Sequence, residues 1–268
     1  VSDTRADLVD IRDRVVLDEP LEERSHLLID AGISRRRIVQ GLEAADLKPA
    51  DLAGVLLTHE HADHVTGLKV LLKKDPVPLY ATAGTLAAIQ KKGMLDDYPA
   101  ERIHVIRGGE AFSLGDLTVL PLSIDHDAAE PVGYRVTNGS KSAAFLTDLG
   151  HATEELEKAL QGLDALLLES NHDVRMLEAG PYPYPLKRRI LGDCGHLSNE
   201  SAGRLLATLC HGGLQQVLLG HLSKENNLPE LAYETVRCEL RLTHGKGEAE
   251  ELPLAVAARD CCSKLYEF

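Results

Sequence analysis

The feature that most constrains this chain is a cluster of metal-binding side chains that directly follows a hydrophobic segment. The apolar run GVLLT at positions 54–58 is typical of a buried β-strand, and the hexapeptide HEHADH follows it at positions 59–64. Imidazoles and carboxylates placed at the end of a rigid element are a common arrangement in metal-dependent enzymes. Because chance rarely gathers so many of these groups in so short a segment, the hexapeptide predicts a metal site.

The spacing divides this segment into two pairs of ligands. In a loop that leaves a strand, His59 and His61 can face the same side, whereas Asp63 and His64 can serve a second ion nearby. A set of imidazoles and carboxylates suits zinc, manganese or iron, so we expect two divalent metal ions. Zinc and manganese are the first candidates. Further ligands must come from other loops, and the best candidates also lie at predicted strand ends: His126, Asp148 and His221.

The charge balance restricts how the protein could hold a polyanion. Lys and Arg number 29 against 42 Asp and Glu, which gives a formal net charge of −13. That excess argues against binding nucleic acid through bulk positive charge. A phosphate-containing substrate must therefore be attracted by positive charge at the site itself. Bound divalent ions would supply that charge.

Cysteine usage and hydropathy predict a cytoplasmic protein without a membrane partner. The five cysteines are an odd number and show no CxxC spacing, which favours a reducing compartment. No apolar run approaches the roughly 20 residues that cross a bilayer, and positions 1–25 are crowded with charged residues, unlike a signal peptide. The hydrophobic content of 44% over 268 residues is enough for a single domain spanning residues 1–268.

The order of hydrophobic patterns is α/β throughout. Strands are expected at 26–30, 54–58, 78–81, 103–106, 117–123, 132–137, 142–147, 165–168 and 216–219. Helices are expected at 34–45 and 66–74, after 153, after 198 and at 228–241, with a proline-rich loop between the strand 165–168 and the helix after 198. The pair Asn138-Gly139 predicts a hairpin turn in the middle region. Mixed sheets with helices outside them favour a four-layered αββα sandwich over a single doubly wound sheet.

Several motifs resemble those of the metallo-β-lactamase superfamily. LLIDAG, THEHADH, TDLG and LLGHLS occur in the order seen in that superfamily, and ESNHD, GPYPYPLKRRI, GDCGHLSNE and GHLSKENN resemble its YycJ/WalJ branch. The resemblance covers residues 26–268, whereas positions 1–25 lack the glycine-rich opening of that branch. Members of the branch are metal-dependent phosphodiesterases associated with 5′ to 3′ exonuclease activity on double-stranded DNA.

The resemblance assigns roles to the candidate ligands. It implies that Asp148 bridges the two ions and that Asp30 orients the histidine loop without binding a metal. His172 is expected near the site but not on an ion. The same resemblance gives one ion to His59, His61 and His126 and the other to Asp63, His64 and His221.

A second resemblance, to tRNA 3′-processing enzymes of the same superfamily, concerns proton transfer. Their Gly-His-Ser-Thr segment is similar to positions 195–198, and their strand-end glutamate to Glu169. This implies that His196 protonates the leaving group and that Glu169 orients it, while Asp63 helps to position the ions. The alternative is that His196 is a packed histidine beside Ser198, which could cap the following helix.

The proline-rich segment suggests where a substrate would be held. Its aromatic and cationic side chains lie close in sequence to His196, and stacking combined with phosphate contact suits a nucleic acid. The alternative is that the prolines build a rigid loop, with solvated charges at the start of a helix. The candidate substrate-binding residues are Tyr182, Tyr184, Lys187, Arg188 and Arg189.

These observations predict a two-metal phosphodiesterase in which hydroxide formed between the ions attacks phosphorus. By resemblance, 5′ to 3′ hydrolysis of double-stranded DNA is expected, with DNA favoured over RNA. Two alternatives stay open: a hydrolase of RNA, a thioester or a lactam on the same fold, and a metal-bound regulatory protein without catalysis.

Overall fold

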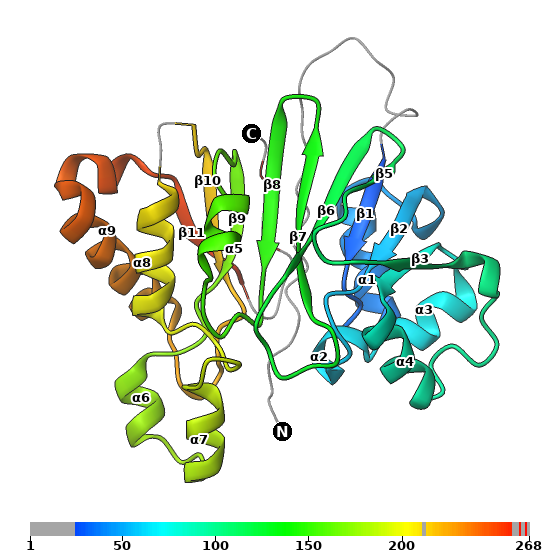
Figure 1. Cartoon of the computed structure of the whole chain (residues 1–268), viewed down its shortest axis with the longest axis horizontal. Coiled ribbons are helices and arrows are strands. Elements are labelled where there is room, and N and C mark those ends of the chain that lie inside the picture. The colour runs from blue at the N-terminus through cyan, green and yellow to red at the C-terminus, as the bar shows by residue number, and fades with distance from the viewer. Residues whose placement is uncertain (1–24, 211–212, 259–262, 264–265, 267–268) are drawn as a thin grey trace.

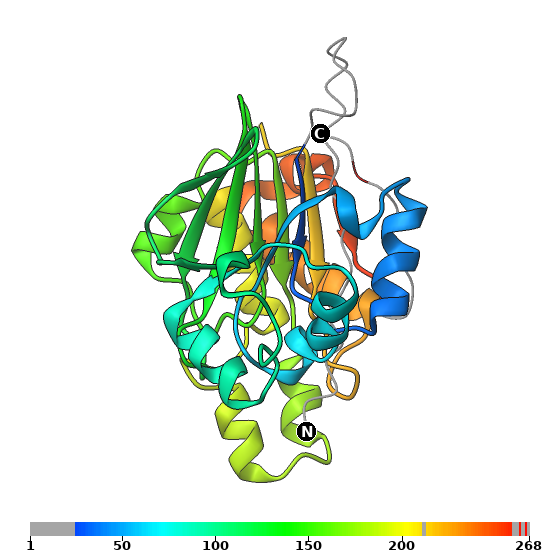
Figure 2. The same cartoon turned by 90° about the vertical axis from the view of Figure 1, so that its right-hand side faces the viewer.

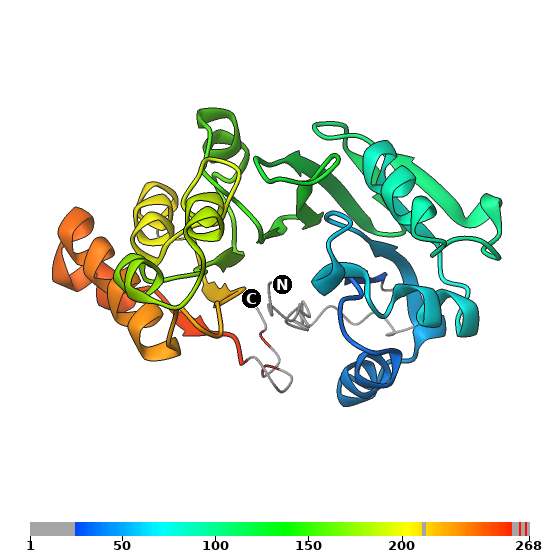
Figure 3. The same ribbon diagram turned by 90° about the horizontal axis from the view of Figure 1, so that it is seen from below.

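Two β-sheets lie face to face and helices cover the outer face of each, as Figures 1 and 3 show. The computed structural model describes residues 25–210, 213–258, 263 and 266. The unusual segment 1–24 and the cysteines at 261 and 262 lie outside the described residues. No helix in the described part of the chain has both the length and the apolar character needed to cross a bilayer.

The smaller sheet is parallel throughout its described strands. It has the order β1 (His26–Ile29), β2 (Leu52–Leu56), β3 (Leu79–Thr82) and β4 (Ile103–Ile106). Its helices are α1 (Arg35–Ala44), α2 (Ala62–Val65), α3 (Leu68–Lys74) and α4 (Ala83–Lys91), and two 3₁₀ turns, η2 (Pro49–Asp51) and η3 (Ala100–Arg102), precede β2 and β4. Fully buried Ile38, Leu71 and Ile89 place the amphipathic faces of α1, α3 and α4 in one apolar core with this sheet.

The larger sheet is mixed and contains seven strands. It runs in the order β11 (Leu254–Val256), β10 (Gln216–Gly220), β9 (Ala165–Glu169), β8 (Lys141–Leu146), β7 (Val132–Asn138), β6 (Leu117–Ser123) and β5 (Phe112–Leu114). Strands β8 to β11 are parallel, and β5 to β8 form antiparallel pairs. Three helices share its largest core: α5 (Glu154–Ala159), α8 (Asn199–Leu209) and α9 (Pro229–Glu251).

The two sheets are held together by a small apolar core and by hydrogen bonds between them. Leu56 of β2 and Tyr134 of β7 are both fully buried in this core. The Tyr134 hydroxyl donates to the Leu57 carbonyl at 2.5 Å, and the Val132 amide donates to the Thr58 carbonyl at 3.0 Å. Since Leu57 and Thr58 immediately precede the histidine segment, the contact between the sheets also fixes where that segment starts.

The structure confirms the predicted α/β sandwich of two sheets, and it adds two helices. The segment expected to be a proline-rich loop contains α6 (Val174–Ala179) and α7 (Tyr184–Ile190). Asp173 caps α6 by accepting from the Met176 amide at 2.7 Å, and Pro183 and Pro185 occupy the start of α7, where a missing N–H costs nothing. Figures 1 and 2 show both helices projecting beyond the sandwich.

Candidate metal centre

Strand ends bring the metal-binding side chains together. His59 follows β2 by three residues, His126 follows β6, Asp148 follows β8, and His221 directly follows β10. These strands belong to both sheets, and their carboxyl ends meet at the end of the sandwich from which α6 and α7 project (Figure 1). Residues more than a hundred positions apart in the sequence therefore form one cluster.

Three of these strand ends have a left-handed backbone. Asp30, Asp148 and His221 have φ angles of 60°, 58° and 55°, and Asp46 is the one further non-glycine residue with positive φ in the described chain. Asp and His tolerate this conformation better than most residues, although it still carries a cost in conformational free energy. Because three residues with this costly conformation lie at one site, the site depends on the direction in which their side chains point.

The clustered ligand atoms form four overlapping groups among the described residues. The Asp148 carboxylate lies at their centre, with Oδ2 at 3.0 Å from His64 Nε2 and Oδ1 at 3.6 Å from both His126 Nε2 and His221 Nε2. Within each group the ligand atoms lie within 4.8 Å of one another; the groups are His59, His61 and His126; Asp63, His64 and His221; His59, His64 and Asp148; and Asp148, Glu169, His196 and His221.

An unsatisfied polar atom in this cluster tests whether a cation fits. His59 Nε2 is buried and has no hydrogen-bond partner among the described residues. A buried polar atom left in this state typically costs about 1–3 kcal/mol, and a metal ion would accept its electron pair. Because the donors are imidazoles and carboxylates, the set fits a divalent metal ion.

Asp30 orients the histidine segment through three hydrogen bonds. Its Oδ1 accepts from the Thr58 amide at 2.8 Å, and its Oδ2 lies 2.8 Å from Thr58 Oγ1 and 2.7 Å from His64 Nδ1. Thr58 Oγ1 in turn lies 3.0 Å from His59 Nδ1. With Nδ1 of both histidines engaged in this way, Nε2 is the nitrogen left for a metal.

Ionisation in the cluster follows from the close approach of opposite charges. Burial alone would lower the pKa of His64, but the charges of Asp148 and Asp30 raise it well above its usual value. Burial would raise the pKa of Asp148, and the charges of His221 and His64 instead lower it well below its usual value. The carboxylate is therefore held as an anion, the form that binds cations.

Glu169 connects two histidines at the end of β9. It is fully buried, and its Oε1 accepts from His196 Nδ1 at 2.8 Å and from His221 Nδ1 at 2.7 Å. The amides of Leu149 and Leu197 donate to Oε2 at 2.9 and 3.1 Å. Burial would raise the pKa of Glu169, but the charge and hydrogen bond of His196 lower it to about 2.

The neighbouring histidines differ in their ionisation. Burial would lower the pKa of His196, but the charge and hydrogen bond of Glu169 raise it. His172 is 1% exposed, its ring nitrogens have no hydrogen-bond partner in the described chain, and burial lowers its pKa to about 4. Among the described residues His172 belongs to none of the ligand groups, and its side chain is packed near Glu169.

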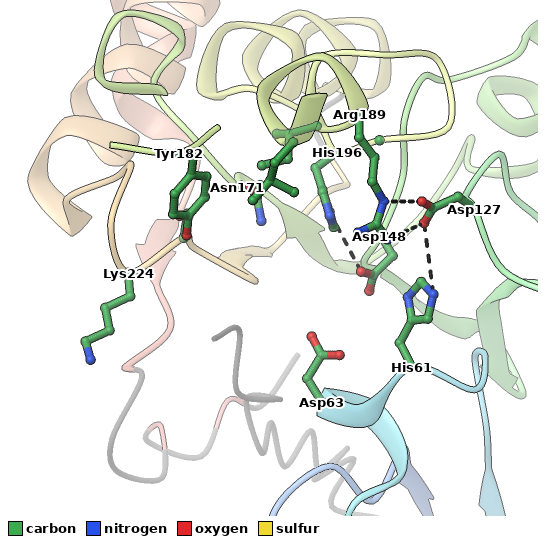
Figure 4. Close-up of a pocket in the computed structure, with 13 residues that line it drawn as sticks. His61, Asp63, Asp127, Asp148, Asn171, Tyr182, Arg189, His196 and Lys224 are labelled. Atoms are coloured by element: carbon green, nitrogen blue, oxygen red, sulfur yellow. Dashed lines mark hydrogen bonds and ion pairs between the residues drawn. The ribbon is translucent and has the colours of Figure 1, made fainter. Parts of the chain in front are cut away.

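A pocket with an empty volume of about 630 Å³, part of it open to solvent, lies beside the cluster. Figure 4 shows Asp63, Asp148, His61 and His196 on one side of it. Sequence reasoning missed Asp127, although it directly follows His126. The complete lining is His61, Asp63, Asp127, Asp148, Asn171, Tyr182, Leu186, Arg189, Ile190, Gly195, His196, Ser223 and Lys224.

The candidate substrate-binding residues divide into two groups. Tyr182 and Arg189 line the pocket, and the Arg189 guanidinium is paired with both carboxylate oxygens of Asp127. The other candidates do not line it: Tyr184 is 72% exposed, Lys187 donates to the Glu178 carbonyl at 2.6 Å, and Arg188 is exposed.

Residues 25–222 match the family model described as beta-lactamase superfamily domain. Over 231 residues the chain is 37% identical to the exodeoxyribonuclease YycJ of Bacillus anthracis, with 86% of this chain and 87% of that protein covered. The chain belongs to the metallo-β-lactamase superfamily. Within it, the exodeoxyribonuclease WalJ of Streptococcus pneumoniae is 38% identical over 213 residues, with 80% of this chain and 79% of that protein covered.

A solved metallo-β-lactamase superfamily structure supports the same fold. The zinc-bound PqqB of Methylobacterium extorquens superimposes with a TM-score of 0.65 at 25% identity, over 89% of this chain and 83% of that one. This superfamily member is thus a YycJ/WalJ-like metal-dependent hydrolase, as the sequence motifs predicted. Its clustered histidines and aspartates fit divalent metal binding.

Proposed function

We propose that this hydrolase is a two-metal DNA exonuclease that removes nucleotides from double-stranded DNA in the 5′ to 3′ direction. The single observation that carries the proposal is the Glu169 carboxylate, which hydrogen-bonds both His196 and the candidate metal ligand His221. This arrangement supports a proton donor beside a site for cations, a combination that suits hydrolysis of a phosphodiester. The similarity to proteins named exodeoxyribonucleases supports DNA as the substrate.

The proposed metal ligands are those that form the compact groups. His59, His61 and His126 would hold one ion, Asp63, His64 and His221 the other, and Asp148 would contact both. Zinc or manganese fits these donors best, and iron is also compatible. Bound divalent ions activate water at neutral pH and stabilise the charge that develops on phosphoryl oxygens.

The chain's own residues supply the proton for the leaving oxygen. Glu169 accepts from His196 Nδ1 at 2.8 Å, which leaves His196 Nε2 for the substrate. Since the same carboxylate raises the pKa of His196, the imidazole keeps its proton to higher pH than it would without Glu169. The side chain lines the pocket, where a leaving oxygen could take that proton.

The role proposed for Asp30 is to position the ligands. Its hydrogen bonds to Thr58 and His64 fix the start of the histidine segment and the direction of His64. A cytoplasmic location belongs to the same proposal, and it is consistent with the exposed thiols of Cys194 and Cys238, which form no disulfide.

Duplex DNA labelled at either the 5′ or the 3′ end tests this function. Protein stripped of metal and reloaded with zinc or manganese should release labelled mononucleotide early from the 5′-labelled strand and late from the 3′-labelled strand. Parallel reactions with RNA, a glutathione thioester and a β-lactam define the competing substrates. Faster turnover of any of these three, or equal attack at both ends, would contradict the proposal.

A further inference from the structure

The pocket has a second side, formed by residues to which neither metal binding nor proton transfer has been assigned. Figure 4 shows Tyr182 and Lys224 on the far side of Asn171 from Asp148. Ser223, which is adjacent to Lys224 in sequence, also lines the pocket. Asn171 follows β9, Tyr182 lies between α6 and α7, and Ser223 and Lys224 follow β10, so the placement of these residues does not depend on the histidine segment.

Asn171 locks the loops after β9 and β10 together. Its amide donates to the Leu197 carbonyl at 2.9 Å, and its carbonyl accepts from the Ser223 amide at 2.7 Å. The Asn171 side chain, which is 3% exposed, donates from Nδ2 to the His221 carbonyl at 2.9 Å. The far side of the pocket is therefore held in a fixed position relative to the candidate metal ligand His221.

The far side of the pocket combines an aromatic ring, that of Tyr182, with the cation Lys224. Leu186 and Ile190, one helical turn apart on α7, add apolar side chains to the lining of the same pocket. Lys224 supplies positive charge on the side away from the carboxylates of Asp63 and Asp148 (Figure 4).

The chemistry of the lining limits what can occupy the pocket, which is partly open to solvent. A planar group that stacks on an aromatic ring and an anion beside a lysine are the two parts of a nucleotide. A single tyrosine ring offers a stacking face to one base rather than to both bases of a pair.

We propose that Tyr182, Asn171, Ser223 and Lys224 form a subsite for a single unpaired nucleotide of the substrate. The base packs against Tyr182, Leu186 and Ile190, and a phosphate lies beside Lys224. This inference rests on the proposed nuclease function, and it adds that the terminal nucleotide leaves the duplex before hydrolysis. Stacking on a tyrosine face tolerates any base, as a nuclease without sequence preference requires.

Calorimetric binding to metal-loaded protein tests the subsite without relying on turnover. Deoxyadenosine monophosphate, deoxyadenosine and inorganic phosphate are the probes. Tyr182→Ala should weaken binding of both the nucleotide and the nucleoside about tenfold, whereas Tyr182→Phe, which keeps the ring, should change them less than about twofold. Lys224→Ala should weaken binding of the nucleotide about tenfold and leave the affinity for the nucleoside unchanged.

Matched controls separate this inference from the proposed function. Lys158→Ala removes an exposed lysine on α5 and should alter none of the affinities, and circular dichroism with metal analysis confirms the fold of each variant. Equal nucleotide affinity in Tyr182→Ala, Lys224→Ala and the unaltered protein would overturn the subsite, as would binding of the nucleotide no tighter than inorganic phosphate. Tight, Tyr182-dependent nucleotide binding without DNA hydrolysis would instead keep the subsite and overturn the nuclease.

Discussion

Glu169 Oε1 accepts a hydrogen bond from His196 Nδ1 at 2.8 Å in a position from which solvent is excluded. The same oxygen lies 2.7 Å from His221 Nδ1, so one carboxylate orients the proposed proton donor and a candidate metal ligand. In a buried site these charge-assisted hydrogen bonds are short and directional. The proposed metal site and the proposed proton donor are thus linked through a single side chain.

The pH dependence of hydrolysis should report this pair. A proton donor is active only while protonated, and Glu169 raises the pKa of His196, so activity should fall as pH rises through that raised pKa. Glu169→Gln removes the negative charge, and burial then lowers the pKa of His196. The alkaline limb of the kcat profile should therefore move to lower pH.

The matched variant is His196→Ala, which should reduce kcat about 10²- to 10⁴-fold and remove the alkaline limb. Metal content of both variants is measured beside the rates, because Glu169 also holds His221. An alkaline limb that stays in place in Glu169→Gln protein with full metal content would contradict the role of His196.

Asp30→Asn should weaken metal binding without removing a ligand. The substitution retains shape but replaces the anion that accepts from Thr58 and His64. Loss of a group that orients metal ligands typically lowers metal affinity about 10- to 100-fold. Zinc affinity measured by competition with a chelator checks this, with Asp97→Asn at an exposed position as the control. Unchanged zinc affinity would show that His64 needs no such support.

Gly195→Ala should damage the site through the backbone. A Cβ atom at this position would lie 2.1 Å from the Ile190 carbonyl oxygen, well inside contact distance. The Gly195 carbonyl lies 3.1 Å from His126 Nδ1, so movement of this loop would shift a candidate ligand and His196 together. We expect a loss of stability of about 1–3 kcal/mol and a large loss of activity.

Thermal unfolding and metal content check the effect of Gly195→Ala. Gly247→Ala is the control, because nothing lies within 4 Å of its added Cβ and alanine favours a helix. A Gly195→Ala protein with the melting temperature and metal content of the unaltered chain would show that the loop has room to adjust.

The parts of the site that could be predicted from sequence are those in which local pattern and chemistry agree. The histidine segment follows an apolar strand, and Asp148 and His221 follow two others, so both their chemistry and their position at strand ends were visible. The αββα sandwich followed from the order of strands and helices and from family motifs. The structure places these residues together, and their assignment to metals stays a prediction.

Other features depend on contacts between distant segments. The pairing of Arg189 with Asp127 joins positions 62 residues apart, and no periodicity indicates it. Asn171 and Lys224 line the pocket because the loops after β9 and β10 meet, a consequence of strand order that local pattern does not contain. Helix α7 starts inside the segment predicted to be a proline-rich loop, and its prolines occupy the N-cap and the first turn, where they are compatible with a helix.

The most direct test of the two-metal centre is metal content measured together with hydrolysis of duplex DNA. Protein purified without added metal should contain about two divalent ions per chain, and a chelator should abolish hydrolysis, which zinc or manganese then restores. Asp148→Ala, which removes the carboxylate between the ligand groups, should lose both metal and activity while remaining folded. Full activity in Asp148→Ala, or in protein shown to be free of metal, would contradict the account.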